Sequence, residues 1–255
     1  MKTLVALPVY NDGASVAGVV RGIRDYLPGP EVDIIAINDG STDATATELL
    51  NVPGIAILTH VKNMGYGAAL GTAFHHAIVG GYEALITIDA DGQHDPVYLT
   101  KLLQALEHCD IASGSRYLRH HEKDTIVPGD RRRINHTITQ ELNDKLGLSL
   151  SDAFCGFKAY RVEALKRLHV TELGYAMPIQ LWVQAVREGL SIKEVAVPRI
   201  YLDPNRSFGA HLDQAEARLA YYRQVLEREM AVCSPFAIES CSGFLAPTSP
   251  CGFCG

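Results

Sequence analysis

The chain has 255 residues, of which 47% are hydrophobic, and a formal net charge of −6. This length and composition predict one large α/β domain with a substantial buried core. The negative charge argues against a general nucleic-acid-binding protein, because phosphate backbones are bound by an excess of lysine and arginine.

Apolar runs along the chain are short. None reaches the roughly 18 apolar residues of a membrane-spanning helix, so we expect any contact with a bilayer to be peripheral. The N-terminal run, MKTLVALPVYND, has the length of a strand and no small-residue cleavage site. We therefore expect a cytoplasmic chain that can lie on the cytoplasmic face of a membrane.

The first 116 residues alternate apolar, β-branched runs with amphipathic segments, which is typical of a mostly parallel sheet covered by helices. Strands are predicted at residues 3–9, 32–38, 55–60, 84–89 and 110–116. Helical spacing of apolar residues predicts helices between these strands. From residue 118 onward, helices are expected at 131–146 and 177–188 around a short segment at 152–160, and an amphipathic helix from 212 to about 230 is expected to pack on the core.

Six cysteines are unevenly placed. Cys109 and Cys155 are expected to be small buried hydrophobes, whereas the other four lie in the last 23 residues, at Cys233, Cys241, Cys251 and Cys254. One CxxC pair with two irregularly spaced partners is a poor zinc pattern, so we expect residues 231–255 to form a loosely ordered tail.

Two aspartates, Asp89 and Asp91, end the apolar run at 84–88. Carboxylates at the end of an apolar strand are costly unless they meet a cation. Mg²⁺ or Mn²⁺ would take their oxygens, complete its shell with phosphate and water, and accept a further oxygen from Gln93. The alternative is that both aspartates only cap the helix that begins near Pro96.

Polar residues follow other predicted strands as well. Asp39 can accept a hydrogen bond from uracil or guanine, and Tyr10 can stack on a base; an Asx-turn and plain packing are the alternatives. A glycine-bearing loop with one positive charge runs from Lys62 through Gly65. Since ligands of open α/β sheets bind beyond the carboxyl ends of strands, these turns predict one shared site.

As a set, these segments resemble family 2 glycosyltransferases of the GT-A fold, and within them the dolichyl-phosphate mannosyltransferase-like branch. The likeness runs from Leu4 to about Tyr160. The matching segments are PVYND at 8–12, NDGSTD at 38–43, NMGYGAA at 63–69, DADGQH at 89–94 and GSRY at 114–117.

The resemblance implies a hexosyltransferase that uses Mg²⁺ or Mn²⁺ and a nucleotide-sugar donor of the GDP-mannose or UDP-glucose type. It implies a donor half at residues 1–117 and an acceptor half at 118–230 of one domain. The donor half would bind the nucleotide through Pro8, Tyr10, Asp12, Asp39, Lys62 and Gly65. The metal and donor phosphates would be held by Asp89, Ala90, Asp91 and Gln93, with Asp91 catalytic.

Departures from the branch bear on the acceptor. Asn135 and Thr139 stand where Ser and Asn are expected, Gln180 stands where a carboxylate is expected, and no Glu-Asp pair with a following Gln-x-x-Arg-Trp is present. A sugar hydroxyl needs a general base to attack, but a phosphate monoester is already anionic at neutral pH. We therefore expect a polyprenyl- or dolichyl-phosphate acceptor.

An anionic acceptor needs cations to align it with an anionic donor. Arg116 and Arg131, the first residue of an arginine triplet, are expected to hold the acceptor phosphate, and Arg206 with Ser207 is expected to join them. The acceptor oxygen would then displace the nucleoside diphosphate in one inverting step. A solvated helix start is the alternative for the arginine triplet.

Three other functions are weighed. A glycosyltransferase acting on a sugar hydroxyl would need a base such as Asp152. A nucleotide-sugar-binding module without catalysis would have little reason to keep two metal-binding aspartates. A dinucleotide-dependent dehydrogenase is disfavoured because no GxGxxG follows the first predicted strand.

Overall fold

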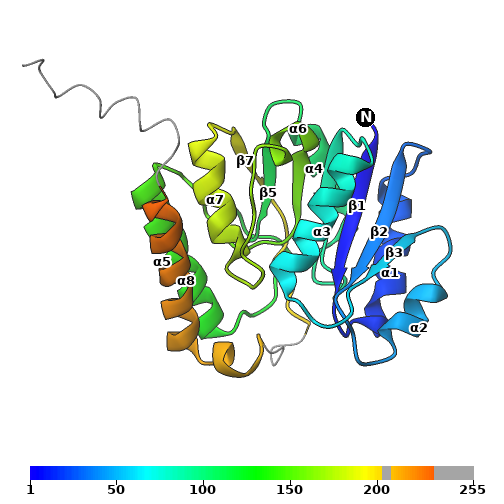
Figure 1. The fold of residues 1–255 in the computed structure, drawn as a ribbon, viewed down its shortest axis with the longest axis horizontal. Coiled ribbons are helices and arrows are strands. Elements are labelled where there is room, and N and C mark those ends of the chain that lie inside the picture. Colours follow the sequence, from blue (N-terminus) through cyan, green and yellow to red (C-terminus); the bar gives the residue numbers. More distant parts are fainter. Residues whose placement is uncertain (203–207, 233–255) are drawn as a thin grey trace, which may run out of the picture.

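The computed structural model describes residues 1–202 and 208–232. Within them, seven strands form one sheet in the order β3-β2-β1-β4-β6-β5-β7 (Figure 1). The strands are β1 Thr3–Val9, β2 Val32–Asn38, β3 Ala56–Thr59, β4 Ala84–Thr87, β5 Ile111–Ser115, β6 Lys158–Arg161 and β7 Ile192–Ala196. Only β6 runs antiparallel to its neighbours, β4 and β5.

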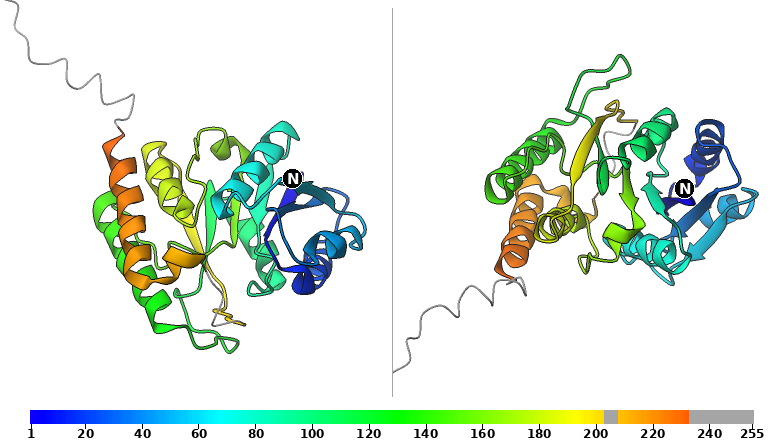
Figure 2. Two further views of the ribbon diagram at one scale, coloured as in Figure 1. Left: turned by 60° about the horizontal axis from the view of Figure 1, so that its bottom comes forward. Right: turned by 90° about the horizontal axis from the view of Figure 1, so that it is seen from above.

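Helices cover both faces of the sheet (Figure 2). They are α1 Gly13–Tyr26, α2 Thr45–Leu50, α3 Tyr66–Val79, α4 Leu99–Ala105, α5 Gly129–Leu146, α6 Val162–Leu165, α7 Met177–Arg187 and α8 Ala215–Ala231, with short 3₁₀ turns at Pro96–Tyr98 and Ala210–Asp213. One apolar cluster joins the sheet to α3 and α5–α8, and a second joins its other face to α1, α2 and α4.

Strand β1 shows why the sheet forms in the middle of these layers. All seven of its residues are buried, and successive side chains alternate between the two clusters, with Leu4 in one and Val5 in the other. A parallel strand that is covered on both faces requires such an unbroken apolar run. The predicted α/β sheet is therefore confirmed.

The end of the described chain differs from the prediction. A single helix from residue 212 was expected, but a 3₁₀ turn at Ala210–Asp213 precedes α8, which begins at Ala215. The helix buries Leu219, Tyr222 and Leu226 as expected, whereas Met230 is 43% exposed. No helix in the described ranges has both the length and the apolar character needed to span a bilayer.

Candidate active site

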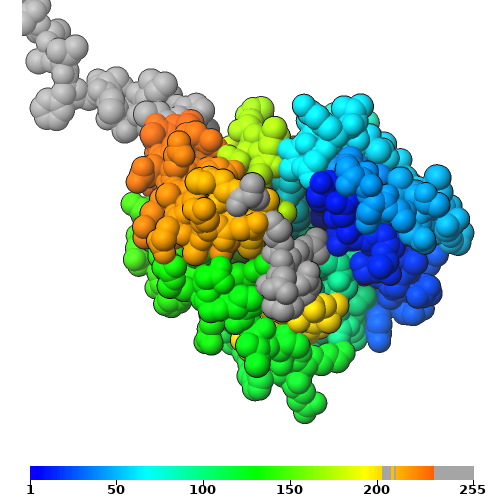
Figure 3. All heavy atoms as spheres, turned by 90° about the horizontal axis from the view of Figure 1, so that it is seen from below, coloured from blue at the N-terminus to red at the C-terminus, as the bar shows by residue number. Residues whose placement is uncertain are grey.

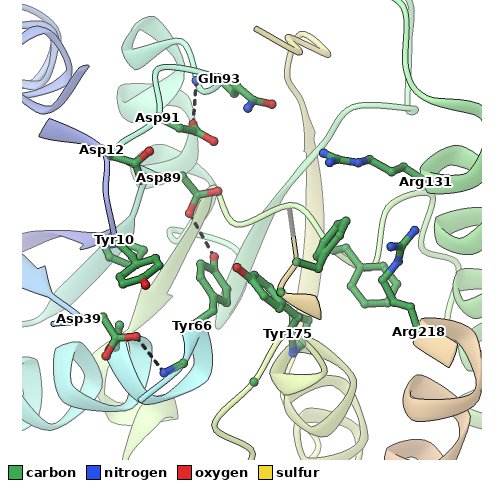
Figure 4. Close-up of a pocket in the computed structure, with 18 of the residues that line it drawn as sticks. Tyr10, Asp12, Asp39, Tyr66, Asp89, Asp91, Gln93, Arg131, Tyr175 and Arg218 are labelled. Atoms are coloured by element: carbon green, nitrogen blue, oxygen red, sulfur yellow. Dashed lines mark hydrogen bonds between the residues drawn. The ribbon is translucent and has the colours of Figure 1, made fainter. Parts of the chain in front are cut away.

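A cavity of about 840 Å³ lies where the carboxyl ends of the parallel strands meet, on the side of the molecule that faces the viewer in Figure 3. Residues after β1, β2, β3, β4 and β5 contribute to its wall, together with residues from α5, α7 and α8. The carboxylates of Asp12, Asp89 and Asp91 lie at one end, and the guanidinium groups of Arg131 and Arg218 lie at the other (Figure 4). The cavity therefore has an acidic end and a basic end.

Asp39 ties two of the strand-end loops together. Its carboxylate accepts hydrogen bonds from the backbone N–H of Met64 at 2.9 Å and of Gly65 at 2.8 Å, and it lies 2.7 Å from Nδ1 of His60. A carboxylate has about four acceptor positions, so one remains for a ligand in the cavity. Gly65 has φ of 106°, and a Cβ there would lie 2.3 Å from the carbonyl oxygen of Leu173, so this loop requires glycine.

Asp89 is held in place by its neighbours. The hydroxyl of Tyr66 donates to Asp89 Oδ1 at 3.2 Å, and the backbone N–H of Asp89 donates to Nδ1 of His94 at 3.2 Å. Burial lowers the pKa of His94 to about 4, so its imidazole is neutral at neutral pH and Nδ1 can accept. A Cβ on Gly156 would lie 2.7 Å from Asp89 Oδ2, so the carboxylate rests directly on that glycine.

The helix-cap interpretation of the two aspartates is wrong. Asp95, not Asp89 or Asp91, caps the 3₁₀ turn at Pro96, with its side chain accepting from Val97 N–H at 3.2 Å. Asp91 accepts from the backbone N–H of Gln93 at 2.9 Å and faces the cavity. Both carboxylates are therefore placed for a ligand.

The acidic end suits a hard divalent cation. Asp89, Asp91 and Gln93, the predicted metal ligands, all line the cavity, and they offer oxygen donors. No cluster of three or more His, Cys, Asp or Glu side chains in the described ranges could hold a metal by itself. Mg²⁺ and Mn²⁺ fit this arrangement, because they accept one or two carboxylates and fill their shell with substrate phosphate and water.

Arg116 reaches the cavity from the end of β5 and is paired with Asp152. Two hydrogen bonds join them, Nε to Oδ2 at 2.7 Å and Nη2 to Oδ1 at 2.9 Å. Burial on its own would raise the pKa of Asp152, but the facing guanidinium outweighs it and the pKa falls to about 2. A buried carboxylate with so low a pKa is a weak base, so the structure argues against Asp152 as a general base.

The two departures near the arginine triplet support the same ion pair. Asn135 donates to Asp152 Oδ1 at 2.7 Å, and the hydroxyl of Thr139 donates to Asn135 Oδ1 at 3.0 Å. The hydroxyl oxygen of Thr139 also accepts from the backbone N–H of Ala153 at 3.2 Å. Both residues are buried. They therefore satisfy the polar groups around Asp152.

The three arginines of the triplet, at 131–133, point to three different surroundings. Arg131 lines the main cavity, with its guanidinium carbon 4.9 Å from the centre of the Phe208 ring. Arg132 lines a second, smaller hollow, and Arg133 pairs with Glu216 on α8 at 2.7 Å. Of the three, only Arg131 belongs to the basic end.

Arg218 on α8 was missed by sequence reasoning. It is 2% exposed, lines the cavity, and places its guanidinium carbon 4.3 Å from the same Phe208 ring. It also donates to Asp130 Oδ2 at 2.7 Å. The available signal was its position, since an arginine four residues before Tyr222 lies on the apolar stripe of the helix and needs a polar partner in the interior.

Aromatic rings lie between the two charged ends (Figure 4). Tyr66 and Tyr175 stack with their centres 5.9 Å apart, and Tyr175 meets Phe208 edge-on at 5.2 Å. Phe154 and Tyr222 stack at 4.8 Å beside them. Apart from Tyr66, whose loop was singled out, these rings were not predicted. They give the middle of the cavity an apolar wall suited to one face of a sugar ring.

The other predicted site residues divide into three groups. Pro8, Tyr10 and Asp12 line the cavity, and Tyr10 is 39% exposed. The structure does not bring Lys62 or Ala90 to the wall: Lys62 is exposed, and Ala90 is buried with its carbonyl accepting from Ser15 Oγ at 2.6 Å. Arg206 and Ser207 lie outside the described residues.

Comparison with known proteins gives three findings. The profile of glycosyl transferase family 2 matches residues 4–169. The undecaprenyl-phosphate mannosyltransferase of Micrococcus luteus is 29% identical over 77% of this chain and 83% of its own length, and the polyprenol monophosphomannose synthase of Mycolicibacterium smegmatis is 30% identical over 77% and 76%. The structure of Mycobacterium tuberculosis glucosyl-3-phosphoglycerate synthase with Mn²⁺, UDP and glucosyl-3-phosphoglycerate shares the fold, with a TM-score of 0.68 at 20% identity over 92% of this chain and 81% of that one.

Proposed function

The chain belongs to glycosyl transferase family 2, and from this premise we propose that it moves a hexose from a nucleoside diphosphate to the phosphate of a polyprenyl-type lipid. The observation that carries the proposal is that one cavity has carboxylates at one end and arginines at the other. Two anionic substrates have to meet in such a reaction, and each end suits one of them. The relatives named for transfer to undecaprenyl phosphate and polyprenol agree with this acceptor class.

The acidic end is proposed to bind the donor. A diphosphate would be repelled by Asp89 and Asp91 alone, so these residues and Gln93 would hold Mg²⁺ or Mn²⁺. When bound, the ion neutralises charge on the departing nucleoside diphosphate. Asp39 would use its remaining acceptor position for a base N–H, and Tyr10 would stack on the base.

The basic end is proposed to bind the acceptor. Arg131, Arg218 and the cavity-facing side of Arg116 offer N–H donors to one phosphate group. The second ionisation of a phosphate monoester has a pKa of about 6, so the attacking oxygen carries charge at neutral pH and no general base is needed. The role of these arginines is to hold that oxygen in line with the anomeric carbon of the donor sugar.

The transfer would proceed in one displacement. An acceptor phosphate oxygen forms a bond to the anomeric carbon as the bond from that carbon to the diphosphate oxygen breaks, which inverts the configuration. Transfer to a sugar hydroxyl is disfavoured because Asp152, the base considered for it, is buried and accepts two hydrogen bonds from the guanidinium group of Arg116. Both ends of the cavity would remain charged before and after transfer.

The proposal is tested by transfer assays with a short-chain polyprenyl phosphate and GDP-mannose or UDP-glucose, with product identified by mass spectrometry. Turnover should require Mg²⁺ or Mn²⁺ and should be lost with EDTA and in Asp91→Asn. The matched control is Asp95→Asn, in the same loop but outside the cavity wall, where asparagine can still cap the turn. Full activity with EDTA or in Asp91→Asn, or transfer to sugar hydroxyls alone, would contradict the proposal.

A further inference from the structure

The loop between β5 and α5, residues 118–128, projects from the body of the protein (Figure 2). Its start carries Leu118, which is 49% exposed, and its C-terminal part carries Ile126, whose surface is 93% exposed. The loop is fixed at its base, because Thr125 N–H donates to the carbonyl of Arg199 at 2.8 Å and Tyr201 N–H donates to Thr125 Oγ1 at 2.7 Å. Since Tyr201 lines the main cavity, the loop is anchored to the wall of the site.

A second hollow, of about 280 Å³, lies at the base of the loop. Its wall includes His120, Asp124, Ile126, Arg132 and Arg199. The carboxylate of Asp124 is already satisfied by its neighbours, with Oδ2 2.8 Å from His120 Nδ1 and Oδ1 accepting from Arg199 N–H at 2.8 Å. Arg132 is exposed and forms no ion pair with another residue of the described ranges. The hollow can therefore receive an anion.

The formal net charge of this segment is opposite in sign to that of the whole chain. Residues 118–133 contain five Lys or Arg and three Asp or Glu, a formal charge of +2, whereas the whole chain carries −6. Lys123 pairs with Asp95 and Arg133 pairs with Glu216, both outside this segment, which leaves Arg119 and Arg132 exposed and without an ion pair to another described residue. An exposed aliphatic side chain beside a basic hollow is suited to a surface that has both anionic groups and an apolar interior.

We propose that residues 118–128 and Arg132 form a docking surface for an anionic lipid bilayer, with the hollow receiving a lipid phosphate and Ile126 entering the interfacial region. The inference rests on the proposed function, because a polyprenyl phosphate presents its head group at a membrane. Docking at this loop would bring the neighbouring cavity edge, including Tyr201 and the 65% exposed Leu202, toward the lipid surface. Figure 3 shows the loop beside residues 199–202.

The test is co-sedimentation with phosphatidylglycerol-containing or pure phosphatidylcholine vesicles, without donor or acceptor. Wild-type protein should bind the anionic vesicles preferentially and release them as salt is raised. Arg132→Glu should weaken partitioning onto anionic vesicles roughly 30-fold, since the charge at this position changes by two units. Ile126→Asp should weaken the partitioning about tenfold or more. Neither side chain supports the core, so both variants should fold normally.

Two matched controls separate this surface from general charge and hydrophobicity. Val79→Asp changes a 72% exposed residue at the C-terminal end of α3, and Arg21→Glu reverses an exposed charge on α1. Both should bind anionic vesicles like the wild type. Equal binding to both vesicle types by the wild type, or wild-type binding by Ile126→Asp and Arg132→Glu, would overturn the proposal. Failure of the wild type to modify a water-soluble short-chain acceptor would instead count against the proposed function.

Discussion

Gly156→Ala is a direct probe of how Asp89 is positioned. Gly156 lies two residues before β6 in the chain. Its carbonyl accepts a hydrogen bond from Oγ1 of Thr87, the last residue of β4, at 2.7 Å, so its backbone is anchored. A Cβ would lie 2.4 Å from the Tyr66 hydroxyl and 2.7 Å from Asp89 Oδ2. Because the backbone is held, the two side chains have to move.

The size of the effect follows from these contacts. To reach an ordinary separation of 3.4 Å, the Asp89 oxygen must retreat by about 0.7 Å and the Tyr66 oxygen by about 1 Å. Misplacing a catalytic group by about 1 Å costs roughly 100-fold in rate, or about 2.7 kcal/mol of transition-state stabilisation. We therefore expect kcat/KM to fall roughly 100-fold, with the fold retained.

The assay is hexose transfer at saturating Mn²⁺, together with the melting temperature. Gly71→Ala is the control, because a Cβ at that helical position meets nothing within 4 Å and alanine favours a helix. The double variant Gly156→Ala with Tyr66→Phe removes one clash but leaves the one with Asp89, so it should remain slow. Wild-type kcat/KM in Gly156→Ala would refute the assigned position of Asp89.

Three further outcomes are expected. Arg131→Gln should raise the acceptor KM about tenfold or more and leave donor binding unchanged, whereas Arg133→Gln should behave like the wild type; equal effects on both substrates would contradict this. Asp152→Asn should lower the free energy of unfolding by about 3–5 kcal/mol in urea titrations, because it leaves the buried Arg116 charge without its partner. In the folded protein the pKa of His94 is lowered to about 4, so below pH 6.5 the unfolded chain binds more protons than the folded one. The free energy of unfolding should therefore fall by about 3 kcal/mol between pH 6.5 and pH 4. The variant His94→Gln should lack this part of the pH dependence.

The sheet could be predicted wherever the apolar run was long. The predicted residues 3–9 and 32–38 are β1 and β2, because the part of each strand that is covered on both faces is a mostly apolar run. At the edge, β3 is shorter than predicted, and the buried strand β6 lies at the end of the short segment expected at 152–160, for which no strand bounds were predicted. Its four residues lie between β4 and β5, and their pairing depends on contacts distant in sequence.

The residues of the site also fall into those that the sequence could predict and those that it could not. Asp39, Asp89 and Asp91 could be found because they follow strands, and all carboxyl ends of the parallel strands meet at one edge. Arg218 and Phe208 belong to the C-terminal part of the chain, whose position over the cavity is set by the packing of α8 on α5 and α7. The apolar stripe of the helix predicts that it packs on the core, but no local pattern predicts which of its side chains reach the cavity. His94 lay within a matched segment, but its role depends on being buried against Phe157, 5.1 Å between ring centres.

The central claim is that the acidic end binds a nucleoside diphosphate through a divalent ion, while the basic end serves the acceptor. It is tested most directly by calorimetric titration of GDP and UDP with and without Mn²⁺, using the wild type, Asp91→Asn and Arg131→Gln. We expect Mn²⁺-dependent binding of one nucleotide by the wild type and Arg131→Gln, and its loss in Asp91→Asn. Binding that is independent of Mn²⁺, or unchanged in Asp91→Asn, would contradict the claim.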